Sequence, residues 1–141
     1  MMLKVDRKCF VQETDFKEAY NDNSRRIGWN TTISAPHMHA RTLEELIPAL
    51  PPGGKAVDIG TGSGYLAVCF AEIMGEGSTV YALDHIQEIT DYAMANSKKQ
   101  HAHLTFNNRL IPITKEGRLG LPEHGPYDVI HIGGAIDTVT E

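Results

Sequence analysis

From residue 40 onward, short apolar runs alternate with longer segments whose apolar residues recur at helical spacing. The short runs are rich in β-branched and aromatic residues and predict strands over 55–60, 78–84, 109–114 and 127–133. The longer segments predict helices over 40–50, 64–75 and 85–100. Residues 1–30 are polar and weakly periodic. We therefore expect an N-terminal arm over 1–30 and a domain over 31–141.

The order of these elements predicts an α/β fold with a mainly parallel sheet. Right-handed crossovers place the second strand beside the first and the third outside it, and the fourth strand returns to the other side of the first. The expected strand order is therefore 3-2-1-4. Pro112 cannot donate a ladder hydrogen bond, which suits the third strand to an edge. This order creates a switch point at the carboxyl end of the first strand, where open α/β sheets bind ligands.

A glycine-rich loop, DIGTGSG (58–64), opens into that switch point. Gly62, Gly64 and Ala67 fit a dinucleotide-binding fingerprint loosely, and Asp84 lies at about the right distance to hold a ribose. Asp58 favours a different cofactor, because a carboxylate repels a pyrophosphate but attracts an ammonium or sulfonium group. S-adenosylmethionine carries both cations and no phosphate. The alternative is that Asp58 and Asp84 only cap the ends of their strands.

Composition narrows the class of protein. The 141 residues, 41% of them hydrophobic and 22% charged, suit one globular domain. A net charge of −5 argues against electrostatic binding of nucleic acid or of an anionic membrane over a broad surface. Two cysteines give no disulfide framework, and no signal peptide or membrane span is recognisable, so we expect a cytoplasmic protein. The two His-x-His pairs point apart on a helix, so no metal site is expected.

Five segments resemble the protein-L-isoaspartate (D-aspartate) O-methyltransferase family: TISAPHMHA (32–40), VDIGTGSGYLAVCFA (57–71), ALDHI (82–86), EGRLG (116–120) and PYDVIHIGGA (126–135). The first segment is the specific one, because other enzymes that use S-adenosylmethionine share only the glycine loop and the following acid. The resemblance covers nearly the whole chain. It implies a Rossmann-like, adenosylmethionine-dependent methyltransferase fold.

The family resemblance implies methyl transfer from S-adenosylmethionine to the free α-carboxylate of L-isoaspartyl and D-aspartyl residues. S-adenosylhomocysteine is then the product, and the partners are damaged, isoaspartyl-containing proteins and peptides. The methyl ester collapses to a succinimide, which starts repair. The substrate carboxylate is the nucleophile and is ionised at neutral pH, so no general base is needed. The protein mainly has to hold the two reactants in line and exclude water.

The resemblance also suggests roles for individual residues. Ser34 is the expected catalytic residue, which orients the substrate carboxylate; its alternative role is to cap the helix that follows. We expect the substrate to contact Thr32, Ile33, Ser34, His131, Ile132 and Gly133. We expect the cofactor to contact Asp58, Gly60, Thr61, Gly62, Ser63, Gly64, Asp84, His85, Glu116, Gly117 and Arg118. Glu116 stands where the family usually has an aspartate that accepts from the adenine amino group.

The family has a helical segment before Val5 and further strands after Ala135. We therefore expect a shortened domain without the later strands and with an open edge at the fourth strand, which leads either to a homodimer through that edge or to aggregation. A second function class stays open, a non-catalytic module that binds adenosylmethionine or a partner with the same fold. A nucleic-acid or small-molecule methyltransferase lacks support, because no base-reading Asn/Asp-Pro-Pro-Tyr motif follows the fourth strand and there is no basic surplus.

Overall fold

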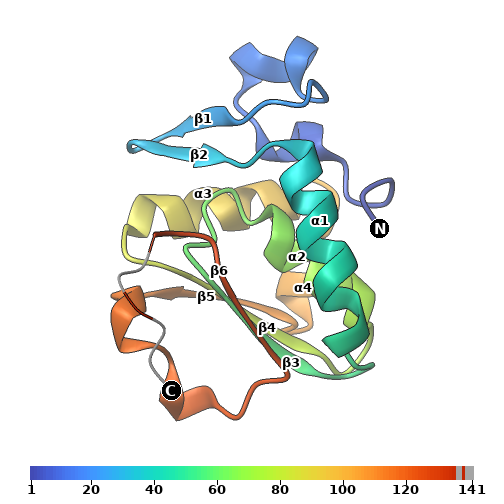
Figure 1. Cartoon of the computed structure of the whole chain (residues 1–141), viewed down its shortest axis with the longest axis vertical. Coiled ribbons are helices and arrows are strands. Elements are labelled where there is room, and N and C mark those ends of the chain that lie inside the picture. The colour runs from blue at the N-terminus through green and yellow to red at the C-terminus, as the bar shows by residue number, and fades with distance from the viewer. Residues whose placement is uncertain (136–137, 139–141) are drawn as a thin grey trace.

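A computed structural model describes residues 1–135 and 138 (Figure 1). Its main sheet contains four parallel strands in the order β5-β4-β3-β6, which confirms the predicted order. The strands are β3 (Lys55–Ile59), β4 (Thr79–Asp84), β5 (Leu110–Thr114) and β6 (Val129–Ile132). Each lies within its predicted range. Pro112 lies in β5, at one edge of this sheet, where its missing N–H leaves no ladder bond unmade.

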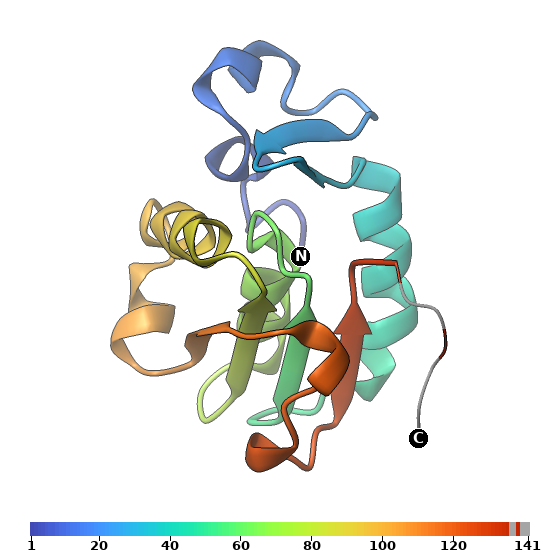
Figure 2. The same cartoon turned by 90° about the vertical axis from the view of Figure 1, so that its left-hand side faces the viewer.

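The two faces of the sheet are covered in different ways. Residues of one face, including Ala56, Val80 and Leu110, belong to a large buried cluster with residues of all four α-helices. Val57, Tyr81 and other residues of the opposite face form a smaller cluster with Leu121 and Tyr127. Leu121 and Tyr127 come from the connection between β5 and β6, which passes in front of the sheet in Figure 2. This connection contains only the short 3-10 helices η4 (Gly117–Leu119) and η5 (Pro122–His124).

The helices are α1 (Pro36–Leu46), α2 (Tyr65–Met74), α3 (Gln87–Lys98) and α4 (Ala102–Phe106). α1 begins earlier than predicted because Pro36 fits the first turn of a helix, where an N–H has no partner. It ends earlier too, and the chain continues as the 3-10 helix η3 (Ile47–Ala49) around Pro48. α4 was not predicted. Within the described residues, no helix is long and apolar enough to span a membrane.

The N-terminal segment differs from the polar arm expected for it. It forms the 3-10 helices η1 (Arg7–Phe10) and η2 (Glu13–Glu18), followed by an antiparallel hairpin of β1 (Arg25–Gly28) and β2 (Thr31–Ile33). Val5, Phe10 and Val11 are buried and belong to the same hydrophobic cluster as α2. The segment therefore supplies core residues, although a domain division at residue 30 stays a prediction.

Candidate functional site

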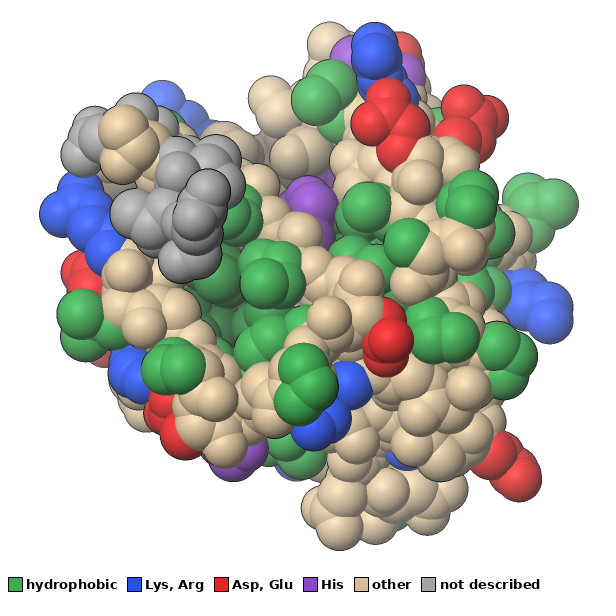
Figure 3. All heavy atoms as spheres, turned by 60° about the horizontal axis from the view of Figure 1, so that its bottom comes forward, with side chains coloured by type: hydrophobic (Ala, Val, Ile, Leu, Met, Phe, Trp, Pro, Cys, Tyr) green, Lys and Arg blue, Asp and Glu red, His purple; other side chains and the backbone are tan. Residues whose placement is uncertain are grey.

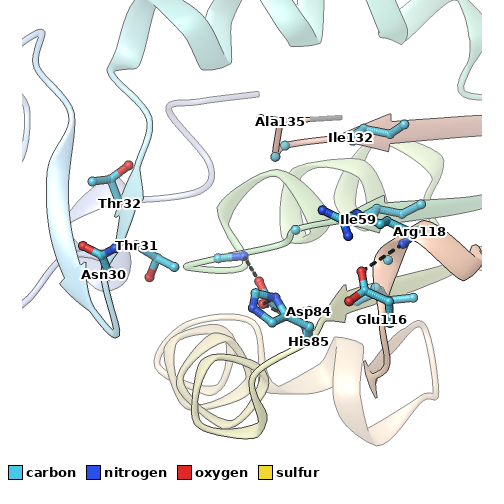
Figure 4. A pocket seen from close by; sticks show the side chains of 16 residues that line it. Asn30, Thr31, Thr32, Ile59, Asp84, His85, Glu116, Arg118, Ile132 and Ala135 are labelled. Atoms are coloured by element: carbon cyan, nitrogen blue, oxygen red, sulfur yellow. Dashed lines mark hydrogen bonds and ion pairs between the residues drawn. The ribbon is translucent and has the colours of Figure 1, made fainter. Parts of the chain in front are cut away.

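Two adjoining cavities open at the carboxyl ends of the parallel strands. The larger has a volume of about 470 Å³ and is lined from the β1–β2 hairpin, the glycine loop, the end of β4, η4 and the chain after β6 (Figure 4). The smaller, of about 50 Å³, lies between β2, the glycine loop and β6. The two share Thr32, Gly60, Gly62 and Gly133. This is the switch point that the strand order predicts.

The glycine loop is fixed by hydrogen bonds of its own amides. The N–H groups of Gly60 and Thr61 both donate to Leu83 O, at 2.8 and 3.0 Å. Gly60 has a φ of +76°, and a Cβ there would lie 3.3 Å from Gly134 N. Glycine at this position therefore lets the loop turn closely past the chain that follows β6.

Asp58, at the end of β3, is buried beside the smaller cavity and is 1% exposed. Its Oδ1 accepts from His131 Nδ1 at 2.7 Å, and its Oδ2 accepts from Thr61 Oγ1 at 2.8 Å. Each carboxylate oxygen keeps one further lone pair for another donor. The hydrogen bonds fix the carboxylate in one orientation and leave it able to bind a cation.

Asp84, at the end of β4, lines the larger cavity and is held by backbone amides. Its Oδ2 accepts from Gly62 N at 3.3 Å, and its Oδ1 accepts from His85 N at 2.9 Å (Figure 4). The exposed ring of His85 lies at the cavity, with its Nδ1 3.2 Å from Asp84 Oδ1. Asp84 therefore links the glycine loop to β4 and presents its carboxylate at the cavity wall.

Glu116 and Arg118 lie at the end of the larger cavity that is farthest from the hairpin (Figure 4). Glu116 caps η4, because its Oε1 accepts from Arg118 N at 3.2 Å. This contact uses one oxygen and orients the carboxylate. Both side chains are exposed, and Gly117 between them also lines the larger cavity.

The hairpin and the start of α1 form the remaining wall. Ser34 lies in the smaller cavity and is exposed, and the residue that caps α1 is Ala35, with no side-chain hydrogen bond. The alternative role of Ser34 as the helix cap is therefore wrong. Thr32 and Ile33 line the same cavity, with Ile33 packed into the core.

The smaller cavity includes two aromatic residues that the sequence analysis did not assign to the site. The ring of His39 stacks on Tyr65 with centroids 4.6 Å apart, and its Nδ1 lies 3.2 Å from Arg7 Nη1. Burial, together with the positive charge of Arg7, lowers the pKa of His39 to about 3. His39 is therefore a neutral, rigid part of this wall.

Of the predicted site residues, only Gly64 lines neither cavity; it lies at the start of α2 against Ala93. The lining residues not predicted for the site are Asn30, Thr31, His39, Ile59, Tyr65, Leu66, Leu83, Gly134 and Ala135. Asn30 and Thr31 directly precede the predicted Thr32, which is the one sequence signal that could have found them. Among the residues with described positions, no three metal-ligating side chains form a cluster.

Known proteins match this chain over its whole length. The family profile of protein-L-isoaspartate (D-aspartate) O-methyltransferases matches residues 1–141. Protein-L-isoaspartate O-methyltransferase of Caenorhabditis elegans is 40% identical over 95% of the chain, and isoform 1 of Arabidopsis thaliana is 39% identical over 99%. The chain spans 58% and 60% of the lengths of these two relatives.

A solved structure supports the same relationship. A protein-L-isoaspartate O-methyltransferase from Plasmodium falciparum, in complex with S-adenosyl-L-homocysteine, superposes with a TM-score of 0.88 at 34% identity. The match covers 99% of this chain and 66% of that one. The profile, the relatives and the fold agree, and the chain belongs to the protein-L-isoaspartate (D-aspartate) O-methyltransferase family.

Proposed function

We propose that this protein transfers a methyl group from S-adenosylmethionine to the free α-carboxylate of L-isoaspartyl and D-aspartyl residues in damaged proteins. The observation that carries the proposal is the pair of joined cavities. Their walls include the carboxylates of Asp58 and Asp84 together with the hydroxyl of Ser34, which lies in the segment that is specific to the family. The family assignment supports the same reaction.

The hydrogen bonds of the glycine loop support adenosylmethionine over a dinucleotide. A pyrophosphate is bound by unpaired backbone N–H groups. Here the amides of Gly60 and Thr61 donate to Leu83 O, that of Gly62 to Asp84 Oδ2, and that of Gly64 to Thr61 O. Four loop donors are thus occupied within the protein, and the nearby acceptors are carboxylates. This donor and acceptor set fits a cation and a ribose diol.

Three polar groups of the cofactor have a matching carboxylate in the larger or the smaller cavity. We assign the ribose hydroxyls to Asp84, because one carboxylate can accept two hydrogen bonds from a vicinal diol. The ammonium group is assigned to Asp58 and the adenine amino group to Glu116. When bound, the cofactor supplies an activated methyl group on its sulfonium.

Ser34 would orient the substrate carboxylate by donating a hydrogen bond from its hydroxyl. The carboxylate is ionised at neutral pH, so the chain needs no base near Ser34. Thr32 is exposed and would extend the same wall toward the peptide, while the buried Ile33 supports that wall from the core. Catalysis would then come mainly from alignment of the reacting groups.

The decisive experiment measures methyl transfer from labelled S-adenosylmethionine to an isoaspartyl peptide and to its aspartyl twin. We expect label in the isoaspartyl peptide alone. Calorimetry should also detect binding of S-adenosylhomocysteine and no binding of a nicotinamide dinucleotide. Binding without transfer would favour the non-catalytic module instead, and tight dinucleotide binding would contradict the cofactor assignment.

The remaining assignments follow from the same proposal. The partners are isoaspartyl-containing proteins and peptides, and the net charge of −5 argues against nucleic acid and anionic membranes as partners. A cytoplasmic location stays a prediction, which imaging of the tagged protein would test.

A further inference from the structure

The pairing of His131 with Asp58 follows from the register of two neighbouring strands. The two residues lie directly opposite one another in the parallel register of β3 and β6. His131 Nδ1 donates to Asp58 Oδ1 at 2.7 Å, and the side chains are only 18% and 2% exposed. The backbone register therefore fixes this ion pair at the base of the smaller cavity.

The charge of this pair depends on the protonation of His131. Burial by itself would lower the pKa of His131, but the hydrogen bond to Asp58 and its negative charge outweigh burial and raise that pKa above the ordinary value. A protonated His131 cancels the charge of Asp58. A neutral His131 keeps the same hydrogen bond and leaves Asp58 with a full negative charge.

The other titratable groups around the pair do not change charge in the same range. Burial and the charge of Arg7 lower the pKa of His39 on α1 to about 3. Burial raises the pKa of Tyr65 on α2, and raises that of Cys69 to about 12. Arg7 reaches His39 from the N-terminal segment and stays a cation. Across the neutral range, His131 is therefore the group that changes the charge beside Asp58 among the residues whose positions are described.

We propose that the proton on His131 and the ammonium group of the cofactor compete for the Asp58 carboxylate, which makes His131 a positioning residue that couples cofactor binding to pH. This inference rests on the proposed function, in which Asp58 receives the ammonium group. Because binding favours the neutral ring, it releases a proton. Affinity then rises with pH, by up to about tenfold per pH unit while His131 is still protonated in the free protein, and levels off above that range.

Calorimetry of S-adenosylhomocysteine binding to the full chain tests this competition. The pH series should stay below the range in which the ligand loses its own ammonium proton. Titrations in two buffers of different ionisation enthalpy count the protons released. His131→Asn is the key variant, because its amide nitrogen can replace Nδ1 as a donor to Asp58 but cannot take up a second proton. We expect its affinity to be flat across the series.

Two controls isolate the mechanism. His103 pairs with Glu72, at 3.1 Å and outside both cavities, so His103→Asn should keep the pH profile of the parent protein. 5′-Methylthioadenosine lacks the ammonium group, so its affinity should not depend on the protonation of His131. The proposed competition is wrong if the affinity of the parent protein does not change with pH. It is also wrong if the affinity changes with pH equally in His131→Asn, or equally for 5′-methylthioadenosine. Absence of S-adenosylhomocysteine binding at every pH overturns the proposed function, and this inference with it.

Discussion

Two walls of the joined cavities are built from different kinds of structure. The wall with Asp58 and Asp84 stands on central strands, and both carboxylates are buried and held by two hydrogen bonds each. The opposite wall stands on a two-stranded hairpin, and its Asn30, Thr32 and Ser34 are exposed. In Figure 4 the hairpin residues face Asp84 and His85 across the cavity.

This difference matches the different requirements of the two ligands that we propose, the cofactor and the protein substrate. A cofactor of constant shape suits a wall whose side chains are already oriented by the core. A protein substrate varies in sequence around the reacting residue, which suits an exposed wall that makes few contacts within the protein. Substitutions in the first wall should therefore affect folding or cofactor binding, and substitutions in the second should affect transfer.

The largest expected effect on stability comes from Gly64→Ala, at the glycine that packs the glycine loop against α3. Gly64 has a φ of +83°, and a Cβ there would lie 2.9 Å from Ala93 Cβ. Backbone strain and overpacking together should lower the free energy of unfolding by about 2–5 kcal/mol. Gly77→Ala is the matched control, with a φ of +79° but no neighbour nearer than 3.7 Å. Urea unfolding should show that the control loses about 1–2 kcal/mol of unfolding free energy. Equal losses in the two variants would show that the contact with Ala93 is not the cause of the destabilisation.

Asp84→Ala should weaken binding of S-adenosylhomocysteine by about 1–3 kcal/mol, the range for hydrogen bonds to a charged group. Calorimetry measures this directly. Asp91→Ala removes an exposed carboxylate from α3, outside both cavities, and should leave the affinity unchanged. An unchanged affinity in Asp84→Ala would show that the carboxylate only anchors Gly62.

Ser34→Ala tests the opposite wall. We expect transfer to an isoaspartyl peptide to fall about tenfold to a hundredfold, because the carboxylate loses its alignment with the methyl group. The affinity for S-adenosylhomocysteine should stay the same. Ser24→Ala changes an exposed serine just before β1 and should alter neither quantity. Loss of cofactor binding in Ser34→Ala would contradict the separation of the two walls.

A third wall includes residues of β6, which pairs only with β3 among the described strands. Its Ile130 and Ile132 are 57% and 36% exposed. Figure 3 shows that hydrophobic side chains also gather near the centre of one face of the molecule. Open strand edges recruit further strands, so we expect the 141-residue chain either to form a homodimer through this edge or to aggregate.

Light scattering over a dilution series should therefore show self-association, and Ile130→Asp should shift it toward the monomer. Phe106→Asp changes a 79% exposed residue on α4 and is the control. A parent chain that stays monomeric at high concentration would contradict the dimer.

Sequence patterns predicted the central strands and their order well, because parallel strands buried on both sides read as continuous apolar runs. They did not predict the hairpin, whose turn uses Trp29 and Asn30 at φ values of 48° and 58°, which most residues avoid. The burial of Val5 and Phe10 was not predicted, because the apolar residues of this segment do not recur at the spacing of a helix or a strand.

The pairing of Asp58 with His131 also could not be predicted. The two residues are 73 positions apart, and they were expected to contact different ligands. Only the register between β3 and β6 places them side by side. The glycine loop directly follows β3, and Asp84 is the last residue of β4. Their expected placement therefore depended only on where each strand ends, which the local sequence does specify.

The tip of the hairpin gives the molecule a built-in optical probe. Trp29 is the single tryptophan of the chain, it is 44% exposed, and its ring centroid lies 5.9 Å from that of Tyr92 on α3. Its neighbours Asn30 and Thr31 line the larger cavity. Movement of the hairpin relative to α3 would change the solvation of the indole and therefore its emission wavelength. Selective excitation of Trp29 would thus report movement of the exposed wall during a titration, without any added label.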